Sequence, residues 1–145
     1  MKVAVGCDHA GLAMKNALKD ILESWGHEVA DLGCYCEDSV DYPDYAAEVS
    51  RRVASGEYET GILICGTGLG MAISANKIKG VRAVVAHDTF SARMSRAHNN
   101  ANVLALGARV IGPGLAEEIV KVWLSTPFEG GRHQRRVDKI TLLEG

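Results

Sequence analysis

The hydrophobic positions of the chain form short apolar runs that alternate with segments of helical periodicity. The apolar runs predict five buried strands, at residues 2–6, 28–33, 61–65, 81–86 and 103–106. The segments between them predict helices at residues 14–25, 45–55, from the glycines after residue 65 to about 78, 89–97, and from Pro113 onward. In that later helix we expect Leu115, Ile119, Val120 and Trp123 on the inner side, and the polar, basic stretch after Gly131 predicts a C-terminal helix.

The alternation of strands and helices predicts an α/β fold with about five parallel strands between layers of helices. No linker, repeat or low-complexity block interrupts the pattern, so residues 1–145 are expected to form a single domain. Ligands of such sheets bind beyond the carboxyl ends of the strands. Asp8, Thr67 and Asp88 fall at such ends, although ordinary turn residues also gather there.

Composition and charge narrow the function classes. The formal net charge of −2 over 145 residues gives no general reason to expect nucleic acid or an anionic membrane as a partner. No apolar run approaches the roughly 20 residues of a membrane span, and the first strand starts without a leader pattern, so cytoplasmic localisation is expected. The four cysteines are expected to be reduced thiols, and no His/Cys pair completes a zinc site around Cys34 and Cys36.

A glycine-rich segment, Cys65 to Gly70, follows the third predicted strand and opens a helix. Its glycines let the backbone approach a ligand, and free N–H groups at a helix start can hold an anion. A thiol there is stabilised as thiolate, so Cys65 is a candidate base or nucleophile beside an oxyanion hole. A buried structural cysteine beside a tight turn is the competing interpretation.

The same segment also invites a nucleotide-binding interpretation. The glycines at 66, 68 and 70 resemble a dinucleotide fingerprint, and Asp88 lies about 20 residues further on. The third glycine comes one residue early, however, and no second lobe is present for a dehydrogenase substrate. The phosphate-loop pattern fails because no Lys-Ser/Thr pair follows the glycines.

Three further groups have both a functional and an ordinary interpretation. Asp8 could cap a helix, with His9 a satisfied polar neighbour, or the two could bind a ligand. The Asn-rich segment 98–102 is typical of a turn. Arg132 and Arg136 share one helical face and could converge on a phosphate, or they could belong to a solvated basic helix.

Seven segments considered together resemble the type B ribose-5-phosphate isomerase family, which also includes allose-6-phosphate isomerases and galactose-6-phosphate isomerase subunits. They lie in order along nearly the whole chain, at residues 6–11, 41–44, 61–68, 75–77, 95–99, 102–109 and 128–133. The resemblance implies a Rossmann-like three-layer sandwich and a homodimer with each active site at the subunit interface, with tetramers an open alternative. It also implies an aldose–ketose isomerase of the pentose phosphate pathway that uses no metal or organic cofactor.

The resemblance also assigns roles to residues. Cys65 is the base that moves a proton between C2 and C1 through an enediolate, while His98, helped by Thr67, acts in ring opening. The residues implied for binding the sugar, the phosphate and the intermediate are Asp8, His9, Tyr42, Gly66, Gly68, Leu69, Gly70, Asn99, Arg109, Arg132 and Arg136. Some family members use a glutamate just after the glycine loop; Met71 stands there, which places this chain in the cysteine branch.

The expected reaction interconverts ribose 5-phosphate and ribulose 5-phosphate. The family signature also spans six-carbon substrates, so an allose-6-phosphate isomerase is an alternative. A non-catalytic phosphate- or nucleotide-binding module remains a third hypothesis.

Overall fold

Five strands form one parallel sheet in the order β2-β1-β3-β5-β4 in the computed structural model, which describes all 145 residues. The strands are β1 (Lys2–Cys7), β2 (Glu28–Asp31), β3 (Thr60–Cys65), β4 (Ala83–Val85) and β5 (Val103–Gly107). The helices are α1 (Leu12–Ser24), α2 (Tyr42–Ala54), α3 (Leu69–Ala75), α4 (Thr89–Ala97), α5 (Pro113–Ser125) and α6 (Arg132–Leu142), with a short 3₁₀ turn at His9–Gly11.

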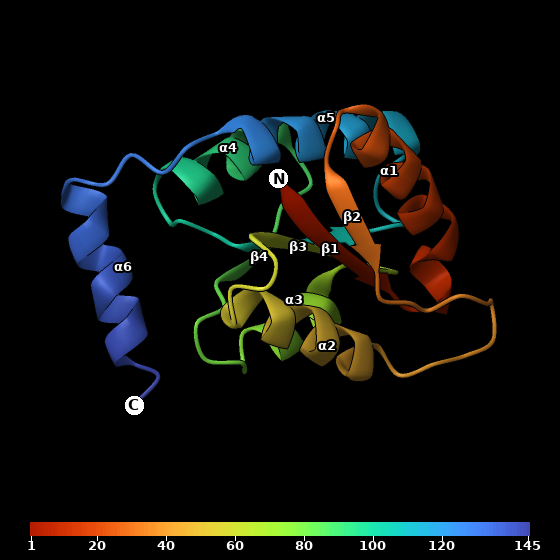
Figure 1. Cartoon of the computed structure of the whole chain (residues 1–145), viewed down its shortest axis with the longest axis horizontal. Helices are drawn as coiled ribbons and strands as arrows, with labels where there is room; N and C mark the ends of the chain where they lie inside the picture. The colour runs from red at the N-terminus through yellow and green to blue at the C-terminus, as the bar shows by residue number, and fades with distance from the viewer.

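The side chains of each strand point alternately to the two faces of the sheet, and both faces are apolar here. Helices therefore cover both of them. Ile62 and Ile64 of β3 pack with residues of α1, α4 and α5, whereas Leu63 packs with residues of α2 and α3. Figure 1 shows α1, α4 and α5 on one side of the sheet and α2 and α3 on the other. The three-layer α/β fold expected from the sequence is confirmed.

Close packing explains a glycine on the α2 face of the sheet. A Cβ atom at Gly61 would lie 2.6 Å from Val49 Cγ1. No real Cβ contact is that short, so only glycine lets α2 pack directly on β3. The helix that lines one side of the candidate site is thereby fixed to the central strand.

Several predicted boundaries need correction. Helix α2 begins at Tyr42 rather than residue 45, because Pro43 occupies its first turn, a position that proline favours. Strand β2 ends at Asp31, β4 spans only three residues, and α3 ends at Ala75. Leu115 was expected on the inner side of α5, but it is 42% exposed and only Ile119, Val120 and Trp123 are buried as expected.

A buried ion pair fixes the loop between β2 and α2. Lys15 on α1 is only 1% exposed, and its Nζ lies 2.8 Å from an Asp31 carboxylate oxygen. The same Nζ donates to the Cys34 carbonyl at 2.6 Å. A buried ammonium needs both partners to offset its lost hydration. The loop that follows β2 is therefore attached to α1 from within.

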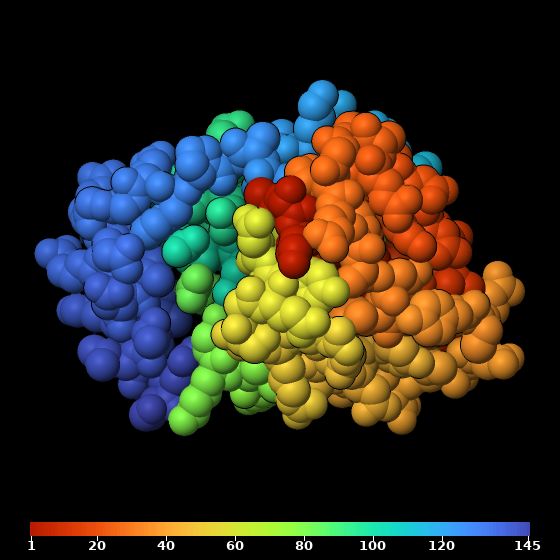
Figure 2. Space-filling model, viewed as in Figure 1, coloured from red at the N-terminus to blue at the C-terminus, as the bar shows by residue number.

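Helix α6 stands to one side of the sandwich (Figure 1), and Figure 2 shows this blue segment beside the green segment that leads into β4. The Gly80 N–H donates to Glu144 just beyond α6 at 2.9 Å. Leu142 and Leu143 at the end of α6 are 78% and 85% exposed, so this end of the helix leaves apolar side chains uncovered. No helix of the structure combines the length and the apolar character that crossing a membrane requires.

Candidate active site

The carboxyl ends of β1, β3 and β5 surround a polar pocket of about 300 Å³. Its lining residues come from the loops that follow these strands, from α3 and from the first turn of α2. They are Asp8, Tyr42, Cys65, Gly66, Thr67, Gly70 and Arg109. This is the edge at which parallel sheets bind ligands, and all seven residues belong to the predicted site.

Cys65 is the last residue of β3 and is 5% exposed. Its Sγ accepts the Gly68 N–H at 3.1 Å. Gly68 adopts the left-handed conformation (φ +80°), which glycine accepts without strain, and the chain turns there into α3. Helix α3 has only seven residues, so this direct hydrogen bond is the main contact that the loop makes with the sulfur.

The loop after Cys65 presents free backbone donors. Thr67 Oγ1 accepts the Leu69 N–H at 3.2 Å, whereas the N–H groups of Gly66 and Thr67 have no acceptor within the chain. Gly107 packs under this loop, where a Cβ atom would lie 2.7 Å from the Thr67 carbonyl carbon. The loop is therefore held in place with two amides available for a ligand oxygen.

The position of Asp8 is compatible with both helix capping and ligand binding. One carboxylate oxygen accepts the N–H groups of Ala10 and Gly11, at 2.9 and 3.2 Å, and so caps the 3₁₀ turn. The side chain also lines the pocket, although the residue is only 7% exposed. A carboxylate held in this way is preorganised to accept a hydrogen bond from a ligand hydroxyl.

His9 adjoins Asp8 but does not line the pocket. Its Nδ1 accepts the Val40 N–H at 3.2 Å, so the neutral ring carries its proton on Nε2. Val40 belongs to the loop that Lys15 secures. The orientation of His9 thus depends on the same loop.

Arg109 follows β5 and crosses the face of Gly66. A Cβ atom built on Gly66 would lie 3.4 Å from both Cδ and Nη1 of Arg109. The guanidinium lines the pocket and supplies its positive charge. Arg109 is therefore able to bind an anionic group, such as a phosphate, beside Cys65.

His98, Asn99, Arg132 and Arg136 lie at the opposite edge of the sheet, toward the amino ends of the strands. Helix α4 runs back against the strands, so His98 at its end lies near the start of β5, whereas Cys65 pairs with the last residue of that strand. A strand of five or six residues separates the two edges by roughly 15–20 Å. His98 is absent from the Cys65 pocket, and one chain does not bring the two predicted catalytic residues together.

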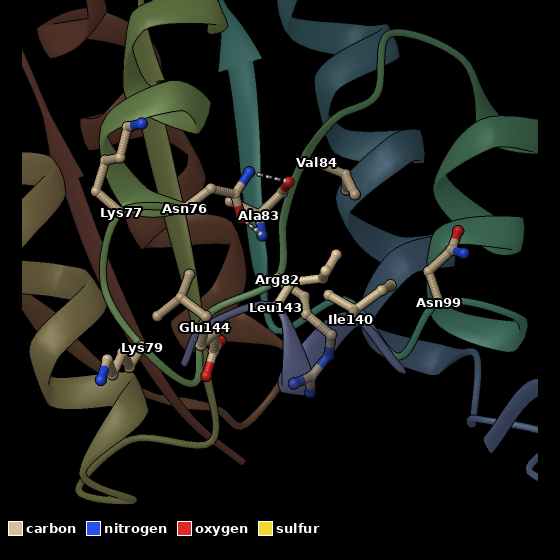
Figure 3. Close-up of a pocket in the computed structure, with 11 residues that line it drawn as sticks. Asn76, Lys77, Lys79, Arg82, Ala83, Val84, Asn99, Ile140, Leu143 and Glu144 are labelled. Atoms are coloured by element: carbon tan, nitrogen blue, oxygen red, sulfur yellow. Dashed lines mark hydrogen bonds between the residues drawn. The ribbon is translucent and has the colours of Figure 1, made fainter. Parts of the chain in front are cut away.

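Asn99, Arg132 and Arg136 share that opposite edge. Asn99 lines a cavity of about 530 Å³ between the start of β4 and the end of α6, where it lies across from Ile140 (Figure 3). Arg132 and Arg136 are exposed on α6. Leu69 and Gly68 belong to the Cys65 loop but do not line its pocket.

Sequence reasoning assigned no role to Glu129 and His133, which contact His98. The imidazole rings of His98 and His133 stack with centroids 4.1 Å apart and planes 12° from parallel. One carboxylate oxygen of Glu129 lies 3.8 Å from His98 Nε2 and 3.5 Å from His133 Nε2. Burial lowers the pKa of His133, and the positive charge of His98 lowers it further. The i, i+4 spacing of Glu129 and His133 was the one available signal for this cluster.

These three side chains are also the group that comes closest to a metal site. Their ligand atoms lie within 4.8 Å of one another. The two rings are nearly parallel, however, so the in-plane lone pairs of their Nε2 atoms do not converge on one centre. The arrangement is that of a stacked pair beside a carboxylate rather than of a coordination site.

Asp88, the acidic residue of the nucleotide-binding interpretation, has a structural partner, and so does the neighbouring His87. The Asp88 carboxylate accepts the Ser91 N–H at 2.6 Å and caps α4, and this bond lowers the pKa of Asp88. His87 Nε2 accepts the Gly107 N–H at 2.9 Å. Asp88 is thus occupied as a helix cap, which removes the main support for a ribose-binding carboxylate.

Comparison with known proteins shows the family to which the chain belongs. The family model described as Ribose/Galactose Isomerase matches residues 3–140. Ribose-5-phosphate isomerase B of Escherichia coli is 51% identical over 99% of this chain and 96% of its own length. D-erythrulose-4-phosphate isomerase of Pectobacterium atrosepticum is 45% identical over 99% and 95%. The solved ribose-5-phosphate isomerase B of Clostridium thermocellum superposes with a TM-score of 0.98 at 51% identity, covering 99% of this chain and 97% of that one. On these similarities of sequence and structure, the chain belongs to the ribose/galactose isomerase family.

Proposed function

We propose that this chain is an aldose–ketose isomerase that interconverts ribose 5-phosphate and ribulose 5-phosphate with Cys65 as the base. The observation that carries the proposal is a buried thiol that accepts the Gly68 N–H at 3.1 Å inside a pocket that also holds Asp8 and Arg109. Family membership supports the reaction class, and the E. coli relative carries this activity in its name.

The proposed chemistry follows from the groups in the pocket. The Cys65 thiolate takes the proton from C2 of the open-chain aldose, the C–H electron pair forms the C1–C2 double bond, and the C1 carbonyl electrons move to O1 to give an enediolate. The O2–H proton passes to O1, which leaves the negative charge on O2. The carbonyl then forms at C2 as the double-bond electrons take the proton back from Cys65 at C1. The free amides of Gly66 and Thr67 would stabilise negative charge on the oxygens of the intermediate.

Substrate positioning is assigned to polar groups around the thiol. Arg109 would bind the phosphate, while Asp8 and Tyr42 would face the sugar. A phosphate held far from the reacting carbons supplies binding energy that orients them. No step requires a metal or an organic cofactor.

A homodimer with shared sites completes the proposal. Cys65, Thr67 and Arg109 lie at the carboxyl edge of the sheet, whereas His98 and Asn99 lie at the amino edge. A twofold axis would bring the carboxyl edge of one chain against the amino edge of its partner and form two equivalent sites. Each would combine Cys65 of one chain with His98, Asn99, Arg132 and Arg136 of the other.

The proposed compartment is the cytosol, where thiols stay reduced.

The alternative substrates differ in the number of carbons in the sugar. The Pectobacterium relative is named for a four-carbon substrate, and the six-carbon allose 6-phosphate is the alternative expected from the sequence. Competition between ribose 5-phosphate, erythrose 4-phosphate and allose 6-phosphate at equal concentrations ranks them by kcat/KM.

Removal of the Cys65 thiol should stop proton transfer at carbon. Cys65→Ala should lower kcat on ribose 5-phosphate by a factor of about 10²–10⁴, the usual contribution of a positioned base, with little change in substrate affinity. Isomerisation is followed by ketose formation and affinity by calorimetry. Cys36→Ala, which removes an exposed thiol, is the matched control. Retained turnover in Cys65→Ala would exclude this residue as the base.

A further inference from the structure

Glu129 faces two stacked imidazoles, and its backbone fixes it there. The Glu129 N–H donates to the carbonyl of Ala97, the residue before His98, at 3.0 Å. Its carboxylate contacts the Nε2 atoms of His98 and His133, at 3.8 and 3.5 Å. The cluster therefore joins the end of α4 to the start of α6 through one side chain.

His133 forms the rigid side of this cluster. Its side chain is 9% exposed, compared with 38% for His98, and the stacked rings are 4.1 Å apart. A side chain that is packed on all sides keeps one rotamer, and a ring stacked upon it loses rotational freedom. His133 thus restricts the plane in which His98 can lie.

The surroundings of His133 favour its neutral form. Burial and the positive groups of His98, Arg132 and Arg136 lower the pKa of His133, and only Glu129 opposes them. A single carboxylate between two imidazoles balances one positive charge. His133 then serves as a neutral surface for the His98 ring, while the Glu129 carboxylate lies 3.8 Å from His98 Nε2.

We propose that Glu129 and His133 are positioning residues for ring opening, which hold His98 with Nε2 toward Glu129 and its other nitrogen toward the sugar ring. This inference rests on the proposed function, in which His98 serves the site of the partner chain. In ring opening the C1–O4 bond breaks and its electron pair goes to O4. The O1 proton is removed, O4 is protonated, and the C1 carbonyl forms.

The inference separates two chemical steps within one turnover. Proton transfer at carbon belongs to Cys65, whereas ring opening and closure belong to His98 and the pair that orients it. Ribulose 5-phosphate carries its phosphate on O5 and has no furanose form, so it reaches the carbon proton-transfer step without ring opening. Exchange of its C1 proton with deuterium from solvent therefore reports Cys65 alone.

The test uses the full-length chain with Glu129→Gln, which keeps the shape of the side chain and removes its charge. Net conversion of ribose 5-phosphate should fall by roughly 10- to 100-fold, the scale of a misplaced catalytic group. Deuterium exchange at C1 of ribulose 5-phosphate, followed by NMR, should stay close to wild type. Glu118→Gln, which neutralises an exposed glutamate on α5, is the matched control and should change neither rate.

Variants of His133 test the stacking contact with His98 separately. His133→Phe keeps a stacked ring and should preserve net conversion, whereas His133→Ala removes the stack and should lower conversion but not deuterium exchange. Thermal unfolding of each variant verifies that it is folded. Equal losses of conversion and exchange in Glu129→Gln, or no loss of either, would overturn the inference. A wild-type chain that neither converts nor exchanges would instead refute the proposed function itself.

Discussion

At the scale of single residues, two buried cysteines on neighbouring strands have opposite surroundings. Cys7 ends β1 with no exposed surface and its sulfur 3.9 Å from that of Cys34, and burial raises the pKa of Cys7 to about 12. Cys65 ends β3, accepts a backbone N–H and opens onto a polar pocket. Cys7 is thus kept as a neutral thiol, whereas Cys65 faces a pocket that a ligand can enter.

Cys7 leads to a prediction about alkaline stability. Its folded pKa of about 12 lies above the ordinary value of 9.0, so the folded state loses stability as pH rises above 9. The loss between pH 9 and pH 10 should be roughly 1 kcal/mol in the free energy of unfolding. Urea unfolding at both pH values measures it. Cys7→Ala should remove this part of the pH dependence, and an unchanged slope in that variant would contradict the assignment.

The parts of the site formed by neighbouring residues could be predicted from the sequence, whereas contacts between distant residues could not. Cys65 and its glycines could be found because the whole arrangement is local, a strand followed by a turn. The dual role of Asp8 could be anticipated only as two alternatives, because capping and ligand binding use the same residue type. The stack of His98 and His133 joins residues 35 positions apart, and no local pattern encodes that contact.

At the scale of elements, the active-site loop depends on the strand beneath it. Gly107 at the end of β5 leaves room for the Thr67 backbone, which holds the two free amides. Strands β3 and β5 are both buried along their whole length, so neither can move away. Any side chain at Gly107 must displace the loop.

Gly107→Ala should therefore impair catalysis and stability together. The added Cβ atom would lie 2.7 Å from the Thr67 carbonyl carbon, which forces the loop outward. We expect a loss of about 1–3 kcal/mol in the free energy of unfolding and a lower kcat/KM. Chemical denaturation and the isomerase assay measure the two effects. Gly114→Ala on α5, where an added Cβ meets no atom within 4 Å, is the control and should leave both unchanged or slightly raise stability.

Element types were predictable because buried parallel strands have continuous apolar runs and the helices between them have clear periodicity. The bounds of α4 were predicted correctly, since Asp88 caps its start. The start of α2 was placed three residues late because Tyr42 and Pro43 show no apolar period. Leu115 was misplaced because its spacing fits the inner face of α5, yet nothing in this chain covers it.

At the scale of the whole molecule, the predicted site residues divide between the two edges of the sheet. The division arises because α4 runs back along the sheet and carries His98 to the start of β5. The order of motifs along a sequence does not show how far apart they lie in the fold. The exposed apolar residues at the end of α6 and the cavity beside them lie at the edge that carries His98 and Asn99. The proposed shared-site dimer would account for all of these features at once.

Mixed dimers test the shared site directly. Cys65→Ala and His98→Asn should each be inactive as homodimers, whereas a dimer of one chain of each retains one intact site. Unfolding and refolding an equal mixture should restore about a quarter of wild-type activity, because half of the dimers are mixed and half of their sites are intact. Light scattering reports the dimer, and the isomerase assay reports the restored sites. No restored activity in refolded dimers would place both residues of a site on one chain.

The placement of His98 and Cys65 at opposite ends of the strands also has a consequence for gene dosage. An isolated chain would hold two half-sites and no whole one, so turnover would require an encounter between two chains. Below the dissociation constant of the dimer, the number of working sites would grow with the square of the chain concentration. Halving the expression of this protein would then remove about three quarters of its flux in that regime, and dilution alone would silence it.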